Sequence, residues 1–238
     1  PGTEKTLLIM TKKKLARFEE LKGMPNVFQS PGDLKGHWHD RVFNNDFPIN
    51  LELGCGRGEY TMALAQRYPE RNFIGVDLKA AGSGTGANAL DHQINNVAFL
   101  RIFIEKLGDY FGPGEVSEIW IPFPDPYPVY SKRKKRLTSS RFLDLYRPVL
   151  KDGGVIHLKT DDDSLYRFSI QSVQEDGSPI ICQADNIDEH PEQDEHWLIR
   201  TRYEVSHRKR GKTIKYLRFS LKPKGEDHVQ TPHRYLQL

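Results

Sequence analysis

Short apolar runs alternate along the chain with stretches in which apolar residues recur at helical spacing. Five runs are predicted to be strands, at residues 49–53, 72–77, 97–102, 116–121 and 155–159. Helices are predicted at residues 60–68 and 141–150, where apolar side chains gather on one face. Strands separated by helices are typical of βαβ units, so the pattern predicts an α/β fold with a parallel sheet covered on both faces.

The two ends of the chain depart from this pattern. Residues 213–221 alternate between apolar and polar side chains, which predicts an antiparallel edge strand with one face in water. Residues 1–45 and 222–238 show weak periodicity. We therefore expect an N-terminal basic arm, one domain over residues 46–221 and a C-terminal tail, in keeping with a length of 238 residues.

Composition narrows the class of protein. The chain is 37% hydrophobic and 28% charged, which excludes a disordered chain, and it has no apolar run long enough to cross a bilayer. Its two cysteines, Cys55 and Cys182, are too few for a disulfide framework or an all-protein zinc site, and we expect no metal. The first residues lack a charged-then-apolar signal pattern, so a cytoplasmic location is expected.

Charge is nearly balanced overall but unevenly distributed. The formal net charge is only +3, from 35 Lys and Arg against 32 Asp and Glu. Basic residues nevertheless cluster at residues 12–17, 132–136 and 200–218. Such clusters favour a polyanionic partner such as a nucleic acid, although solvated loops would give the same pattern.

A glycine-rich turn joins the first predicted strand to the first helix. Gly54, Gly56 and Gly58 occupy alternate positions there, which lets backbone N–H groups approach a ligand at the carboxyl edge of the sheet. The spacing differs from the G-x-G-x-x-G pattern of dinucleotide-binding turns. An ordinary tight turn is the alternative reading.

Two carboxylates flank this turn. Asp77 ends the second strand, where an acidic side chain can accept hydrogen bonds from both ribose hydroxyls of a nucleoside. Glu52 lies just before the glycines and would repel a phosphate, but it suits a ligand with an ammonium or sulfonium group. Since no Walker lysine follows the turn, the residues favour S-adenosylmethionine over NAD or ATP.

A proline-rich loop follows the fourth predicted strand, at residues 122–128. Its prolines hold the backbone extended and place Asp125 between Phe123 and Tyr127. Aromatic rings can stack on a planar base while a carboxylate accepts from its N–H edge, so Asp125 is the candidate catalytic residue. A rigid turn with a solvated Asp is the alternative. The side chains expected to bind substrate phosphates nearby are Lys132, Arg133 and Arg136.

Several segments, in the same order, resemble the bacterial tRNA (guanine-N7-)-methyltransferase family over residues 45–220. They read ELGCGRGE at 52–59, FIGVD at 73–77, FPDP at 123–126, KRLT at 135–138, HLKTD at 157–161 and T-x-Y-E at 201–204. The resemblance implies a Rossmann-like class I methyltransferase fold, with a seven-stranded, mostly parallel sheet, an antiparallel last strand and helices on both faces. The implied activity is methyl transfer from S-adenosylmethionine to N7 of guanine 46 in the variable loop of tRNA.

The resemblance also implies roles for individual residues. Cofactor binding falls to Glu52, Gly54, Gly56, Asp77 and Asp125, and substrate binding to Asp161, Thr201, Tyr203 and Glu204. Two positions depart from the family pattern. No Asp follows the third strand, so Glu105 or a backbone amide is expected to take its place near the adenine. Val129 stands where the family usually has Lys, with Lys132 or Arg133 as the expected substitute.

Two other functions fit the same residues. Asp125-Pro126-Tyr127 is distantly similar to the loop of enzymes that methylate base amino groups, so an amino-group methyltransferase acting on a nucleobase is one alternative. The missing acid after the third strand supports the other, an inactive RNA-binding protein on the same scaffold. Both a monomer and a homodimer are compatible with the sequence.

Overall fold

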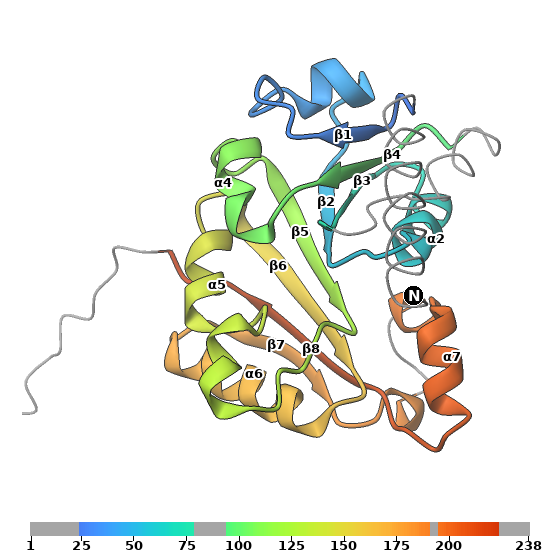
Figure 1. Cartoon of the computed structure of the whole chain (residues 1–238), viewed down its shortest axis with the longest axis vertical. Coiled ribbons are helices and arrows are strands. Elements are labelled where there is room, and N and C mark those ends of the chain that lie inside the picture. The colour runs from blue at the N-terminus through green and yellow to red at the C-terminus, as the bar shows by residue number, and fades with distance from the viewer. Residues whose placement is uncertain (1–23, 79–93, 191–194, 224–238) are drawn as a thin grey trace, which may run out of the picture.

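The computed structural model describes residues 24–78, 94–190 and 195–223, and Figure 1 shows their arrangement around one central sheet. The sheet has eight strands in the order β1-β4-β3-β2-β5-β6-β8-β7. Their bounds are β1 (Val27–Gln29), β2 (Ile49–Leu53), β3 (Asn72–Val76), β4 (Val97–Arg101), β5 (Val116–Pro122), β6 (Leu150–Thr160), β7 (Ile180–Ala184) and β8 (Lys215–Ser220). The strands from β1 to β6 pair in parallel, and β8 runs antiparallel to both of its neighbours.

Helices cover both faces of this sheet. They are α2 (Glu59–Arg67), α4 (Leu107–Tyr110), α5 (Ser140–Tyr146), α6 (Asp163–Glu175) and α7 (Arg202–Arg208), with short turns η1 (His39–Phe43), η2 (Ile104–Lys106), η3 (Tyr130–Lys135), η4 (Ile187–Glu189) and η5 (Glu195–Leu198). Figure 1 shows α4, α5 and α6 on one side and α2 and α7 on the other. Two apolar clusters match this division, one around Phe142 of α5 and one around Leu64 of α2. The predicted α/β class is therefore confirmed.

The predicted strands lie where the apolar runs placed them, with one large difference. β2 has the predicted bounds, whereas β6 begins at Leu150, five residues before the predicted start at 155. The helix predicted to reach residue 150 ends at Tyr146. Pro148 explains the early end, because a proline has no N–H to donate within a helix and its ring clashes with the carbonyl four residues earlier.

Two features of the sheet correct the expected topology. It has eight strands instead of seven, because Val27–Gln29, inside the expected N-terminal arm, pairs with β4. The strand near residues 213–221 was expected at an edge, but β8 lies between β6 and β7, and β7 is the edge strand. A three-residue strand is too short for periodicity to reveal. Residues 1–23 and 224–238 of the expected arm and tail lie outside the described residues.

The order of the strands positions the candidate site. From β2 the chain passes to β3 and β4 on one side, and then to β5 and β6 on the other. Ligands in open α/β sheets bind at the carboxyl ends of the strands beside such a switch point. The glycine turn after β2 and the proline loop after β5 both lie there, and residues 161–163 follow β6 at the same edge.

Candidate cofactor and substrate site

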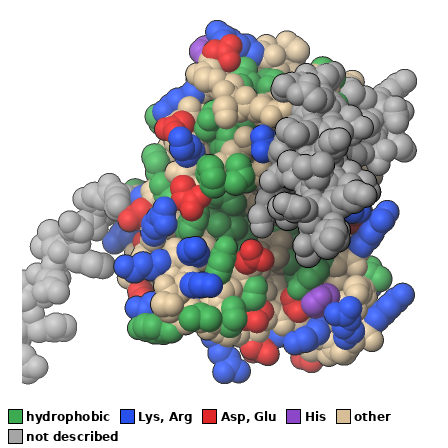
Figure 2. Space-filling model, in the orientation of Figure 1, with side chains coloured by type: hydrophobic (Ala, Val, Ile, Leu, Met, Phe, Trp, Pro, Cys, Tyr) green, Lys and Arg blue, Asp and Glu red, His purple; other side chains and the backbone are tan. Residues whose placement is uncertain are grey.

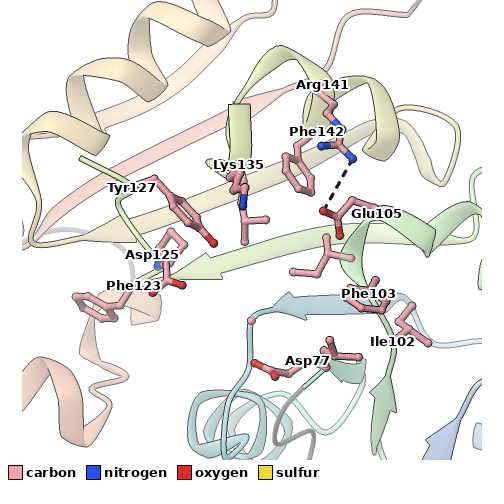
Figure 3. A pocket seen from close by; sticks show the side chains of 15 residues that line it. Asp77, Ile102, Phe103, Glu105, Phe123, Asp125, Tyr127, Lys135, Arg141 and Phe142 are labelled. Carbon is pink, nitrogen blue, oxygen red and sulfur yellow. Dashed lines mark ion pairs between the residues drawn. The ribbon is translucent and has the colours of Figure 1, made fainter. Parts of the chain in front are cut away.

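Two cavities meet at the glycine turn. The Asp125 cavity, of about 520 Å³, is lined by residues from the ends of β3, β4 and β5, among them Asp77, Glu105 and Asp125. The Glu52 cavity, of about 420 Å³, lies toward α2 and α7. Gly54 and Phe123 line both cavities, so the two are neighbouring parts of one site. Figure 3 shows the side chains that line the Asp125 cavity.

The glycine turn is built on backbone that other residues rarely adopt. Gly54, Gly56 and Gly58 have φ angles of 74°, 52° and 79°. The N–H of Gly54 donates to the carbonyl of Val76 at 2.8 Å, which holds the turn against the end of β3. A Cβ on Gly54 or Gly56 would enter open space, whereas one on Gly58 would lie 2.3 Å from Phe99 Cε1. The turn therefore leaves room for a ligand on one side and packs tightly on the other.

The two carboxylates beside the turn have different surroundings. The N–H of Gly56 donates to Asp77 Oδ2 at 3.1 Å, and Asp77 is half-buried at the cavity wall. Glu52 is only 4% exposed and accepts a hydrogen bond from the Thr61 hydroxyl. Burial raises the pKa of Glu52 from its usual 4.5 to about 8. A cationic group placed in this cavity would favour the ionised form of Glu52.

The proline loop is held in strained backbone. Phe123 and Tyr127 have positive φ angles of 51° and 41°, each costing about 1–3 kcal/mol in a residue other than glycine. Arg136 supports the loop from beneath, donating through Nε to the carbonyl of Pro126 at 2.8 Å and through a second nitrogen to that of Tyr127 at 3.2 Å. The Phe123 N–H donates to the Lys159 carbonyl at 2.7 Å. These contacts fix the loop that carries the candidate catalytic carboxylate.

Asp125 and Glu105 face the same cavity from different elements. Asp125 is exposed on the proline loop, and Glu105 on η2 lies 3.9 Å from an Arg141 nitrogen, the ion pair drawn in Figure 3. Glu105 thus stands beside the end of β4, where the sequence predicted a replacement for the missing Asp. Lys135 and Phe142 also line this cavity, although the sequence gave them no cofactor role. Lys135 was within reach of prediction, since it belongs to the basic run at 132–136.

A cluster centred on Asp161 lies at the end of β6. His207 Nδ1 lies 2.8 Å from Asp161 Oδ2, and the Tyr203 hydroxyl donates to Asp161 Oδ1 at 3.5 Å. The rings of Tyr203 and His207 stack at 3.9 Å, and Phe123 lies 5.2 Å from Tyr203. Asp161 and Tyr203, both expected to bind substrate, therefore lie together beside Phe123, and His207 is a member of the cluster that the sequence did not reveal.

Helix α7 is fastened to the domain by a buried ion pair. Its Glu204 is 0% exposed, forms an ion pair with Lys159 Nζ at 2.7 Å, accepts a hydrogen bond from Arg208 Nε at 2.8 Å, and lines neither cavity. Thr201 caps the helix, since its hydroxyl accepts from the Glu204 N–H at 3.1 Å. Thr201 lines the Glu52 cavity, whereas Glu204, which was expected to bind substrate, is buried away from both cavities. Its ion pair with Lys159 ties α7 to β6.

The basic run after the proline loop contains both exposed side chains and a buried one. Lys132 is exposed on η3, and the Arg133 guanidinium lies 3.8 Å above the Tyr130 ring, so both can meet a phosphate, although neither lines the two cavities. Arg136 was expected beside them but is only 6% exposed beneath the loop. Its guanidinium serves backbone carbonyls, which the sequence could not show because those partners belong to a folded loop.

Metal clusters and membrane-spanning helices are two further features for which the described residues can be checked. No group of three or more His, Cys, Asp or Glu side chains in residues 24–78, 94–190 and 195–223 could hold a metal ion. None of the helices within those ranges is long and apolar enough to cross a membrane.

Comparison with known proteins places the chain in a family. Residues 46–217 match the family model Methyltransf_4, described as "Putative methyltransferase". The chain is 42% identical to a tRNA (guanine-N(7)-)-methyltransferase of Bacteroides fragilis, covering 91% of this chain and 89% of the relative, and 47% identical to one of Porphyromonas gingivalis, covering 84% and 86%. Among solved structures, the 16S rRNA methyltransferase KamB shares the fold, with a TM-score of 0.58 at 16% identity over 77% of this chain and 92% of KamB. The chain belongs to the tRNA (guanine-N(7)-)-methyltransferase family.

Proposed function

We propose that this protein transfers a methyl group from S-adenosylmethionine to N7 of a guanine in tRNA, at position 46 of the variable loop. The names of its relatives support the reaction. The observation that carries the proposal is the pair of adjoining cavities, in which Asp77, Asp125 and Glu52 reach one glycine turn from three neighbouring strand ends. Three carboxylates around a glycine turn suit a cationic nucleoside and do not suit a nucleotide phosphate.

The residues fit S-adenosylmethionine in both cavities. Asp77 can accept hydrogen bonds from the ribose hydroxyls. Gly54 and Gly56 have no Cβ, and the space beside them is open, so a ligand can approach the backbone closely. Glu52 suits a cationic group of the cofactor, because a positive charge nearby would lower the raised pKa of this buried carboxyl and favour its ionised form. Ile102, Phe103 and Phe142 give the Asp125 cavity an apolar wall suited to an adenine ring, with Glu105 at its edge. The cofactor, when bound, supplies a methyl group activated by its sulfonium.

Guanine N7 has a lone pair and no proton to lose, so the reaction requires no general base. The chain has to orient the base and stabilise the positive charge that methylation places on the ring. Alignment of this kind can lower a barrier by about 7–11 kcal/mol in favourable cases. We assign the charge stabilisation to Asp125, whose exposed carboxylate is held on a loop fixed by Arg136.

We assign base recognition to the aromatic side of the Glu52 cavity. Tyr203 is tilted against Phe123, and its hydroxyl contacts Asp161. Guanine carries N1–H and N2–H donors on its Watson–Crick edge, whereas adenine lacks this pair. Asp125 lines the adjoining cavity whereas Asp161 lines neither, so we assign acceptance from these donors, and with it the preference for guanine, to Asp125, and the positioning of Tyr203 to Asp161.

The proposal covers a cytoplasmic enzyme that acts as a monomer or homodimer, with Lys132 and Arg133 contacting the tRNA backbone. The test is incubation with unmodified tRNA and a donor labelled on its methyl group, followed by digestion to nucleosides. We expect label in N7-methylguanosine, and label in an amino-methylated adenosine would favour the other enzymatic reading. Calorimetric titration with S-adenosylmethionine separates an inactive scaffold, which would bind tRNA and ignore the donor.

A further inference from the structure

A third cavity lies on the other side of the proline loop. This α6 hollow, of about 680 Å³, is bounded by η3, the start of α5 and one side of α6. Figure 2 shows Lys and Arg side chains spread over the side of the molecule where α5 and α6 lie. None of the cofactor or base-recognition roles assigned above uses this hollow. Its lining includes Tyr130, Arg133, Lys134, Arg136, Arg167 and Phe168.

Three cations of the α6 hollow differ in their partners from Arg141 and Arg147 of the neighbouring helix and turn. Among the described residues, no carboxylate lies within ion-pair distance of Arg133, Lys134 or Arg167, whereas Arg141 and Arg147 are paired. The acid in the lining, Glu175, accepts a hydrogen bond from Gln171 at 2.7 Å. Asp163, near Arg167, is held by Lys215 at 3.0 Å. Four Lys and Arg side chains and one carboxylate line the hollow, so it carries a net positive charge.

Aromatic rings orient two of these cations. The Arg133 guanidinium lies 3.8 Å from the centre of the Tyr130 ring, which is 74% exposed, and the Arg136 guanidinium lies 4.5 Å from that of Phe168. Arg136 already donates to the two loop carbonyls, whereas a guanidinium stacked on an exposed ring, as Arg133 is, keeps its in-plane N–H groups available for phosphate oxygens. An exposed tyrosine beside such a cation also offers a surface on which a nucleoside can stack.

Arg136 connects the α6 hollow to the reaction site. It lines the hollow, and it also holds the carbonyls of Pro126 and Tyr127 in the loop that carries Asp125. A group bound in the hollow would therefore lie one loop away from the Asp125 cavity. An RNA strand whose guanine enters the site can pass over this loop and reach the hollow with its backbone.

We propose that the α6 hollow binds a phosphodiester of the tRNA backbone next to the methylated nucleotide, with Arg167, Lys134 and Arg133 as its ligands. This inference rests on the proposed function, because it takes tRNA as the substrate. It adds Arg167 of α6 to the RNA-binding surface, a residue outside every basic run that the sequence singled out.

The test uses Arg167→Gln and Lys134→Gln in the full chain, with Lys151→Gln as the matched control. All three side chains are exposed, and Lys151 lies outside the α6 hollow at the start of β6. We expect each hollow variant to raise the KM for tRNA several-fold and to reduce the slope of log affinity against log salt by about 0.7–0.9. The kcat and the affinity for S-adenosylmethionine should stay unchanged, as should every parameter of the control.

Wild-type KM and salt slope in both hollow variants would overturn the inference while leaving the methylation reaction intact. If the wild-type protein transfers no methyl group, the proposed function fails, and tRNA binding measured on filters still tests the hollow by the same salt slope. Binding of inorganic phosphate that Arg167→Gln abolishes, while the affinity for tRNA stays at the wild-type value, would indicate a small-anion site and would also overturn the assignment to RNA.

Discussion

Replacement of Glu52 by Gln tests the electrostatics of the cofactor cavity. The Gln side chain keeps the size of Glu52 and can still accept from the Thr61 hydroxyl, but it cannot ionise. Burial holds the pKa of Glu52 at about 8 in the folded protein, against a usual value of 4.5. The folded state keeps the Glu52 proton at pH values where the unfolded chain has lost it. The contribution of protonated Glu52 to the free energy of unfolding is therefore fully present below pH 4.5 and is lost as the pH rises through 8.

The size of the effect follows from the pKa difference. Each pKa unit corresponds to about 1.4 kcal/mol, so the whole window from 4.5 to 8 is worth about 5 kcal/mol, and the part above pH 6 about 3 kcal/mol. We expect the difference in unfolding free energy between Glu52→Gln and the wild type to grow by about 3 kcal/mol in favour of Glu52→Gln as the pH rises from 6 to 9. Other titrating groups are common to both proteins and cancel in this difference.

The assay is urea unfolding of both proteins at pH 6 and pH 9 without ligand. Glu70→Gln is the control, because its side chain is exposed and stays in water in both states. A difference between Glu52→Gln and the wild type that is the same at both pH values would refute the claim that burial keeps Glu52 protonated. A pH-dependent gain of similar size in the control would show that the effect does not arise from burial.

Three further substitutions test other parts of the site. Asp125→Asn should lower kcat with tRNA by about 100-fold while the donor still binds in calorimetry, and an unchanged kcat would remove Asp125 from charge stabilisation. Gly58→Ala should lower the unfolding free energy by about 2–4 kcal/mol, because its Cβ would lie 2.3 Å from Phe99 in backbone with a φ of 79°; urea unfolding measures this, and a wild-type midpoint would contradict the packing. His207→Gln removes the 2.8 Å contact to Asp161 and should raise the KM for tRNA by about 3–10-fold at constant donor affinity, whereas a KM equal to that of the wild type would exclude a positioning role.

The sequence predicted those parts of the site that depend on local pattern. The glycine turn and Asp77 could be placed because a buried strand, a turn and a helix follow one another within a short stretch of chain. The prolines marked the loop around Asp125 as irregular and restricted, but the extended backbone expected of it is interrupted by positive φ angles at Phe123 and Tyr127, and the contacts from Arg136 that hold it could not be predicted. Parallel strands then bring these segments to one edge of the sheet, so their proximity was predictable without a structure.

Side chains whose partners come from distant segments were beyond this reasoning. Glu204 looks like an available acid in the sequence, but Lys159, which lies 45 positions earlier, neutralises it in the interior. Arg136 reads as one more residue of a basic run, yet the folded proline loop turns two carbonyls toward it. Burial and pairing of this kind depend on tertiary packing, which residue spacing does not encode.

The central claim is that the acidic side chains around the glycine turn form the seat of the methyl donor. A crystal structure of the protein soaked with S-adenosylmethionine tests this claim most directly. We expect density for the donor across the two cavities, with its ribose hydroxyls bonded to Asp77 and its cationic part toward Glu52. Density for the donor at another place, with Glu52 and Asp77 making no contact to it, would contradict the account.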